Sequence, residues 1–158
     1  MKKYVFCLIL NSIAFALAAQ LPFAAVRDAV LWQADAAMAV GDGCTATLHA
    51  AVEPGWILYS TSLPEDDPRR TRIDLSGSRG VEFIGVPVPS EPEQDCAETM
   101  DDGAAPHWAS DVSFSVPFRV LDPKEARIEF RVTYMACNGA TCMPPKTETV
   151  TVNIVPEQ

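Results

Sequence analysis

The feature that most constrains the fold is a set of short segments in which apolar and polar residues alternate. The clearest is residues 108–121, WASDVSFSVPFRVL, where every second residue from Val112 to Phe118 is apolar. Residues 126–137 and 147–155 alternate in the same way. Side chains of a strand point alternately to its two faces, so this pattern is typical of strands with one buried face. No segment sustains a helical period, so the chain is predicted to be all-β.

Three more regions carry strand signals between turn residues. Residues 44–52, CTATLHAAV, place Ala46, Leu48 and Ala50 on one face, and WILYS follows the turn EPG. TRIDL and VEFIGVPV are shorter candidates on either side of the turn cluster SGSRG. Short strands with turns between them predict an immunoglobulin-like β-sandwich. Pro117 predicts an edge or a bulge in its strand, because proline cannot donate a ladder hydrogen bond.

Two regions show no regular pattern. Residues 19–36 are predicted to be a leader without a strand. Residues 89–107 form a long acidic loop in the prediction, and loops of that length in compact domains are often functional.

The N-terminus has the pattern of a secretory signal peptide. Lys2 and Lys3 precede an apolar run that ends at Ala16-Leu17-Ala18, a small-residue cleavage motif. We therefore predict a signal peptide over residues 1–18 and a single domain over residues 19–158 that is exported. The chain has 12 basic and 21 acidic residues, a net charge of −9. Such an acidic balance argues against nucleic acid as a partner.

Four cysteines follow the signal, and export permits disulfides between them. Four cysteines allow three pairings, which spacing cannot resolve. Cys137 and Cys142 have four residues between them, including the turn dipeptide Asn138-Gly139. Pro144 and Pro145 follow and remove two backbone donors. The sequence predicts a C-terminal hairpin that carries this cysteine pair.

Three interpretations of the pair remain open on the residues alone. A structural bond is one, although so short a loop gains little stability from closure. A redox pair is the second, since a protruding turn is accessible to an attacking thiolate. The third is a Cu(I) site, because Met135 and Met143 add soft sulfur ligands to the cysteines. No cysteine or histidine cluster has zinc-finger spacing, so no resident metal or cofactor is predicted.

The segment VTYMACNGATCMPPKTETVTV resembles the active-site hairpin of the N-terminal periplasmic domain of DsbD-type thiol:disulfide interchange proteins. That family carries Tyr-x-x-Cys, a short loop and Cys-x-Pro-Pro, which here are Tyr134, Cys137 and Cys142 to Pro145. The segments EPGWILYS and WASDVSFSVPFRV are similar to two further strands of the family. The resemblance covers roughly residues 31–155.

The resemblance implies a function and a set of roles. It implies a protein-disulfide reductase component that takes electrons from a membrane-embedded, DsbD-like donor on another chain. The electrons pass to periplasmic thioredoxin-fold proteins, including those of cytochrome c biogenesis. Cys142 then forms the mixed disulfide with the partner, Cys137 resolves it, and Tyr59 matches the conserved strand tyrosine. The alternatives are a non-catalytic immunoglobulin-like interaction module with a structural disulfide, or a copper-binding periplasmic protein.

The sequence departs from the family pattern at two places. Ile57 stands where the family has a second aromatic residue. The family's cap loop, which shields the cysteines with an aromatic residue, maps inside residues 96–107, where Met100 is the nearest apolar candidate. That loop carries Cys96 instead, and a second disulfide between Cys44 and Cys96 is one prediction for the remaining pair. No Ser-His-Asp order is visible, so hydrolase chemistry is not predicted.

Overall fold

The computed structural model describes residues 28–38, 43–94 and 105–154, and within them every regular element is a strand. The predicted signal peptide lies outside the described residues. The described part of the chain contains no helix that is long and apolar enough to span a bilayer. The strands are β1 (Val30–Met38), β2 (Cys44–Val52), β3 (Ile57–Tyr59), β4 (Arg72–Asp74), β5 (Val81–Phe83), β6 (Val88–Pro89), β7 (His107–Trp108), β8 (Val112–Val120), β9 (Arg127–Tyr134), β10 (Ala136–Cys137) and β11 (Lys146–Asn153).

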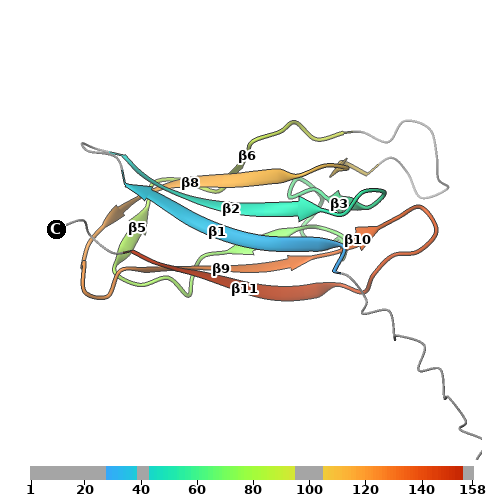
Figure 1. Cartoon of the computed structure of the whole chain (residues 1–158). Helices are drawn as coiled ribbons and strands as arrows, with labels where there is room; N and C mark the ends of the chain where they lie inside the picture. Colours follow the sequence, from blue (N-terminus) through green and yellow to red (C-terminus); the bar gives the residue numbers. More distant parts are fainter. Residues whose placement is uncertain (1–27, 39–42, 95–104, 155–158) are drawn as a thin grey trace, which may run out of the picture.

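Two antiparallel sheets form the layers of a sandwich (Figure 1). One has five strands in the order β1-β2-β8-β5, with β6 also paired to β8. The other has three strands in the order β11-β9-β4. A third, small sheet, β10-β3-β7, lies at one end of the sandwich. The predicted all-β, immunoglobulin-like sandwich with the cysteine pair in a C-terminal hairpin is confirmed.

The core lies between the inward faces of the long strands, at the positions that alternation predicted. The inward residues of β2 and β8 are buried, and those of β9 meet them from the other layer. The largest fully buried side chains are Trp108, Tyr134, Phe114, Phe118, Phe130, Leu48, Leu58 and Ile128. Removing these large apolar surfaces from water is the main favourable term for folding.

The leader prediction for residues 19–36 was wrong in its C-terminal part. Strand β1 pairs with β2 along its whole length, from Val30 opposite Val52 to Met38 opposite Cys44. Its sequence is rich in alanine, which has a low strand propensity, so the local signal was weak. The strand forms because Val30 and Trp32 are buried against the core and β2 offers a complementary edge.

Pro117 lies in an interior strand rather than at an edge. Strand β8 has β2 on one side and the chain from β5 to β6 on the other. That chain interrupts its pairing with β8 between Phe83, opposite Phe118, and Val88, opposite Ser115. The missing N–H of Pro117 falls at this bulge, where Gly85 has a φ of 128°, so no ladder hydrogen bond is lost.

One continuous segment of chain serves two sheets at the cysteine end. Strand β9 pairs with β11 and β4 as far as Tyr134, and after Met135 the chain continues as β10, which pairs with β3. Pro144 and Pro145 lie on the returning chain opposite Met135, between the pairs Tyr134–Lys146 and Cys137–Cys142. Because neither proline can donate a hydrogen bond, regular pairing stops there and the hairpin leaves the sandwich.

Candidate functional site

The turn of the hairpin is built by Asn138 and Gly139. The Asn138 side-chain oxygen accepts hydrogen bonds from the backbone N–H groups of Ala140 (3.1 Å) and Thr141 (2.9 Å). The backbone N–H of Asn138 donates to the carbonyl of Thr141 at 3.0 Å. Gly139 has a φ of 81°, a conformation that disfavours other residues. These bonds close the turn without help from the cysteines.

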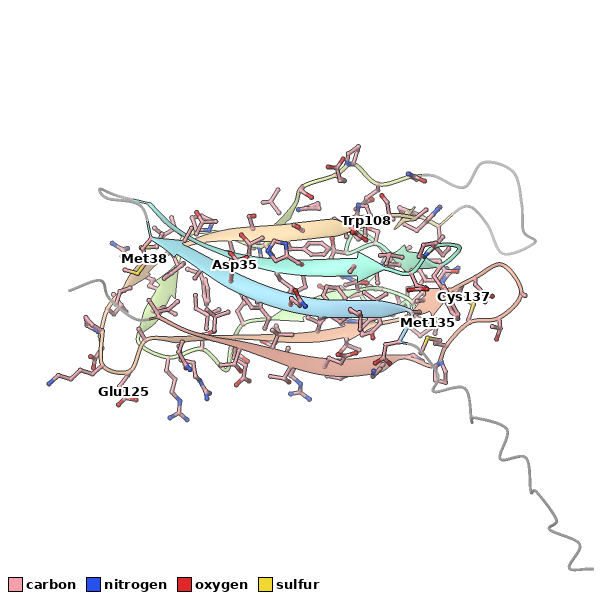
Figure 2. All side chains as sticks on the ribbon, in the orientation of Figure 1. Asp35, Met38, Trp108, Glu125, Met135 and Cys137 are labelled. Atoms are coloured by element: carbon pink, nitrogen blue, oxygen red, sulfur yellow. A yellow bond between two sulfur atoms is a disulfide. The ribbon has the colours of Figure 1, made fainter. Side chains whose placement is uncertain are left out.

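Cys137 and Cys142 form a disulfide across the mouth of this turn, with 4.1 Å between their Cα atoms (Figure 2). They are a directly opposed pair, flanked by the backbone bonds Asn138–Thr141 and Met143–Ala136. Opposed residues that lie between such bonds approach most closely in an antiparallel ladder. The two residues differ in burial: Cys137 is 4 % exposed, whereas Cys142 is exposed.

The soft sulfur donors of the copper alternative lie on two faces of the hairpin. Met143 is opposite Ala136 and packs against the core, so these two residues share the inward face. Cys137 and Cys142 point to the other face, because successive residues of a strand alternate. The set of two cysteines and two methionines is therefore not brought together. Among the described residues, no group of three His, Cys, Asp or Glu side chains is placed to hold a metal ion.

Strand β3 carries the neighbours of the disulfide. Ile57 is opposite Cys137, and the backbone N–H of Tyr59 donates to the carbonyl of Met135 at 3.5 Å. Ile57 and Tyr59 are two residues apart, so both side chains lie on the same face of the small sheet as Cys137 of β10. The predicted supporting tyrosine, Tyr59, thus lies on the same face as Cys137, two residues along β3 from the residue opposite it. Figure 2 places Met135 and Cys137 together at this end of the sandwich.

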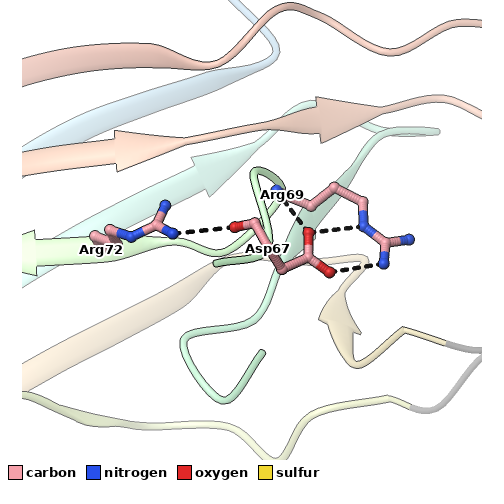
Figure 3. A network of polar contacts seen from close by, with 3 residues as sticks. All are labelled: Asp67, Arg69 and Arg72. Carbon is pink, nitrogen blue, oxygen red and sulfur yellow. Dashed lines mark hydrogen bonds and ion pairs between the residues drawn. The ribbon is translucent and has the colours of Figure 1, made fainter. Parts of the chain in front are cut away.

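An arginine covers the Tyr59 ring. The centre of the Arg69 guanidinium lies 5.4 Å from the ring centroid. Asp67 holds Arg69 through Nε (3.0 Å) and Nη2 (2.8 Å), and it also accepts the Arg69 backbone N–H at 2.8 Å (Figure 3). The Arg69 side chain lowers the pKa of Asp67, and the Asp67 carboxylate raises the pKa of Arg69. Nothing in the sequence pattern of this segment marks Arg69 as a neighbour of Tyr59.

A chain of polar groups holds the base of the hairpin. The buried Tyr134 hydroxyl donates to Glu148 at 2.7 Å. Lys146 donates to Glu148 at 2.9 Å and to Asp28 at 2.7 Å. These contacts join the ends of β9 and β11 to the residues before β1. The predicted supporting residue Tyr134 therefore contacts the base of the hairpin, not the disulfide itself.

The remaining predicted residues are Met100, Cys96 and Cys44. Met100 and Cys96 lie outside the described residues. Cys44 lies at the start of β2, opposite Phe118 and Met38, and has no disulfide partner among the described residues, whereas the hairpin lies at the other end of the sandwich. A second disulfide between Cys44 and Cys96 stays a prediction.

The structure does bring a serine, a histidine and an aspartate together, on the outer face of the five-stranded sheet. His49 lies 2.7 Å from Asp35 through Nε2 and 2.8 Å from Ser113 through Nδ1. The chain of bonds crosses three strands, but it lies on an open sheet surface. The Ser113 backbone N–H donates to Ser90, so it is not available to bind a developing oxyanion. His49 is therefore a surface histidine with both ring nitrogens hydrogen-bonded.

The fold and the hairpin define a class: immunoglobulin-like sandwiches with an accessible disulfide at one end. The chain matches the family "Thiol:disulfide interchange protein DsbD, N-terminal" over residues 27–154. It therefore belongs to this family, and at that level it is a thiol–disulfide exchange module.

Two solved structures have the same fold. One is the DsbD N-terminal domain of Neisseria meningitidis in its reduced form, with 15 % identity and a TM-score of 0.51, covering 81 % of this chain and 87 % of that one. The other is the N-terminal periplasmic domain of ScsB from Proteus mirabilis, with 16 % identity and a TM-score of 0.51. That match covers 80 % of this chain, which spans 47 % of the ScsB domain. A search of curated proteins found no match.

Proposed function

We propose that this chain is the electron-passing module of a periplasmic thiol–disulfide relay, with Cys142 as the sulfur that reacts with the partner and Cys137 as the resolving thiol. The observation that carries the proposal is the difference in burial across the disulfide. Thiol–disulfide exchange requires in-line access to the attacked sulfur. Cys142 is exposed to solvent, whereas Cys137 is buried, with only 4 % of its surface exposed.

The reaction moves two electrons through this pair. A thiolate of the donor attacks the Cys142 sulfur, and the Cys137–Cys142 bond breaks with Cys137 leaving as a thiolate. A second donor thiolate then attacks the donor sulfur of the mixed disulfide, so that the donor is oxidised to a disulfide and Cys142 leaves as a thiolate. The Cys142 thiolate then attacks a disulfide of a thioredoxin-fold acceptor and forms a mixed disulfide. Cys137 attacks the Cys142 sulfur, which restores the starting bond and leaves the acceptor reduced. We infer that the donor is a membrane-embedded, DsbD-like protein on another chain, and that some acceptors serve cytochrome c biogenesis.

The chain reaches this location through residues 1–18, which we propose to be a cleaved signal peptide. Export would place the pair in a compartment where disulfides form and persist. The proposal predicts that the mature protein begins shortly after Ala18. Mass spectrometry of the protein recovered from the periplasm measures this directly.

Separate substitutions of the two cysteines test the roles. Reduced Cys137→Ala retains the exposed thiol and cannot resolve, so it should accumulate a mixed disulfide with an oxidised thioredoxin-fold protein. Reduced Cys142→Ser should form none, because its remaining thiol is buried. A non-reducing gel with mass spectrometry of the adduct measures both. Equal trapping by the two variants would contradict the roles, and a wild-type pair that leaves the acceptor oxidised would contradict the function.

A further inference from the structure

Arg69 presents donors that Asp67 does not use, over a tyrosine of the strand that pairs with Cys137. A guanidinium has five N–H donors arranged as a rigid planar fork. The pairing with Asp67 uses Nε and one hydrogen of Nη2. Asp67 leaves open the edge formed by Nη1 and the second Nη2 hydrogen, and the Tyr59 hydroxyl is a further hydrogen-bonding neighbour of the guanidinium that helps to raise the pKa of Arg69. The Arg69 side chain is 30 % exposed, so solvent or another protein can reach it.

The guanidinium is held in place before any partner arrives. Asp67 fixes one edge, and the Tyr59 ring lies 5.4 Å from its centre. Arg72 in turn donates to the Asp67 carbonyl at 3.1 Å. A donor that is already ordered loses little conformational entropy when it binds, which makes such a group effective in recognition.

The loop is also tied to the strand that faces the cysteines. The Thr71 hydroxyl donates to the Tyr59 carbonyl at 2.5 Å, and the Thr71 backbone N–H donates to the Ser60 carbonyl at 3.2 Å. Tyr59 is two residues, roughly 7 Å along the strand, from Ile57, which is opposite Cys137. The Arg69 fork thus has a fixed position relative to β3, the strand that pairs with Cys137.

We propose that the edge of Arg69 that Asp67 leaves open is a docking point for a carboxylate of the protein that exchanges disulfides with Cys142. The proposal rests on the proposed function of the cysteine pair. Two parallel N–H donors match the two oxygens of a carboxylate, a pairing that sets orientation as well as affinity. The partner class is a disulfide protein with an Asp or Glu close to its reactive cysteine.

The contact acts at short range. The segment from Pro64 to Arg72 carries three acidic and three arginine side chains, so it has no net charge of its own. The whole chain carries −9 and does not attract acidic proteins from a distance. The Arg69 contact therefore stabilises the docked encounter and its orientation rather than accelerating diffusion.

Two series of disulfide peptides test the proposal, and matched members of the two series differ in one residue. Each carries a cysteine in a mixed disulfide with neutral 2-thiopyridine, and a nearby position is Glu in one series and Gln in the other. The reduced Cys142 thiolate attacks the peptide sulfur, and 2-thiopyridone leaves with the bonding electrons and takes up a proton. Cys137 then attacks the Cys142 sulfur and releases the peptide thiol, so the pair is oxidised by two electrons. Absorbance of 2-thiopyridone gives the rate constant.

The wild-type protein should react about two- to fivefold faster with the best Glu peptide than with its Gln partner, since exposed charge pairs contribute modestly. Arg69→Gln should make the two rates equal while the Gln-peptide rate is unchanged. Arg69→Lys should retain only part of the preference, because lysine lacks the planar fork. Arg119→Gln is the matched control. Arg119 is an exposed arginine of β8 that forms an ion pair with Glu82 of β5, and it lies at the end of the sandwich away from the hairpin.

The outcomes separate the two proposals. A Glu preference that survives Arg69→Gln, or that Arg119→Gln also removes, would overturn the docking role and leave the cysteine chemistry intact. The same holds if no position in the peptides gives a Glu preference. If the wild-type protein releases no free peptide thiol from either series, the proposed function itself is wrong.

Discussion

Tyr134 connects the sandwich core to the hairpin through a single polar atom. Its ring lies in the core, 5.3 Å from the Trp32 ring, and its hydroxyl reaches Glu148. Burial is the main cause that raises the pKa of Tyr134 far above the usual value, and the adjacent carboxylate of Glu148 adds to it. The same carboxylate raises the pKa of Lys146, together with Asp28, whose contribution is larger.

This raised pKa predicts a loss of stability in alkali. Below about pH 10 the phenol is protonated in both the folded and the unfolded state, so its contribution to the free energy of unfolding is fully present. Above that pH the unfolded chain releases the proton first, and the free energy of unfolding falls as pH rises toward the folded-state pKa. We expect Tyr134→Phe to reduce this fall by about 1 kcal/mol between pH 10 and 11. Lys146 titrates in the same window, so the fall should shrink rather than vanish.

Urea unfolding at pH 8, 10 and 11 measures the effect. Tyr59→Phe is the control, because it removes a phenol that lies outside the core and retains Tyr134. If Tyr134→Phe and wild type lose stability in parallel across these pH values, ionisation of the Tyr134 hydroxyl does not contribute to the loss of stability in alkali.

At this scale the sequence predicted the cysteine pair of the hairpin better than its surroundings. Two cysteines, a turn dipeptide and two prolines within nine residues mark a chemical pattern that is local, and the disulfide is where it was expected. Arg69 could not be predicted, because its position over Tyr59 depends on the fold of a loop whose residues are all common at surfaces. The contact with Asp67 is local but carries no distinctive spacing.

The hairpin as an element is closed by backbone contacts as well as by sulfur. The Asn138 side chain alone accepts two backbone N–H groups of the turn. Those bonds hold the two thiols close when the pair is reduced, which favours formation of the disulfide.

We therefore expect Asn138→Ala to weaken the disulfide relative to the dithiol. Loss of bonds worth about 1 kcal/mol in the reduced hairpin corresponds to an equilibrium constant about fivefold less favourable to the disulfide. Equilibration with dithiothreitol followed by thiol alkylation measures the constant. Thr141→Ala, which retains the backbone N–H bonded to Asn138, should leave it unchanged. An unaltered constant in Asn138→Ala would show that the turn closes without this side chain.

Strand prediction succeeded where the pattern was long and failed where it was short or composed of alanine. Strands β2, β8 and β9 each have eight or nine residues and clear alternation. Strand β7 has two residues, too few for any period, and it exists because His107 and Trp108 pair with β3. Strand β1 is specified by the edge of β2, which is information that lies elsewhere in the chain.

For the whole molecule, the disulfide contributes little to holding the fold together. It lies at one end, outside the core between the two large sheets. Chain-entropy estimates for a loop this short give at most about 2 kcal/mol, and the turn bonds already restrict the chain. This distinguishes the pair from the structural bonds of small disulfide-rich domains.

Reduction should accordingly leave the protein folded. We expect the free energy of unfolding to fall by less than about 2 kcal/mol when the pair is reduced. Tryptophan fluorescence in urea, with and without a phosphine reductant, reports this, because Trp32 and Trp108 are buried in the core. Unfolding on reduction alone would mean that the bond is structural, which would favour the non-catalytic alternative.

The unequal burial of the two sulfurs also limits the number of covalent species that can exist. A symmetric, open disulfide attacked by one thiol gives two isomeric adducts, and each must be resolved by a different route. Here one sulfur faces solvent and the other is covered. A single thiol reagent should consequently yield one adduct at one position, so that the product of any encounter is chemically homogeneous and every adduct is returned through the same intramolecular step.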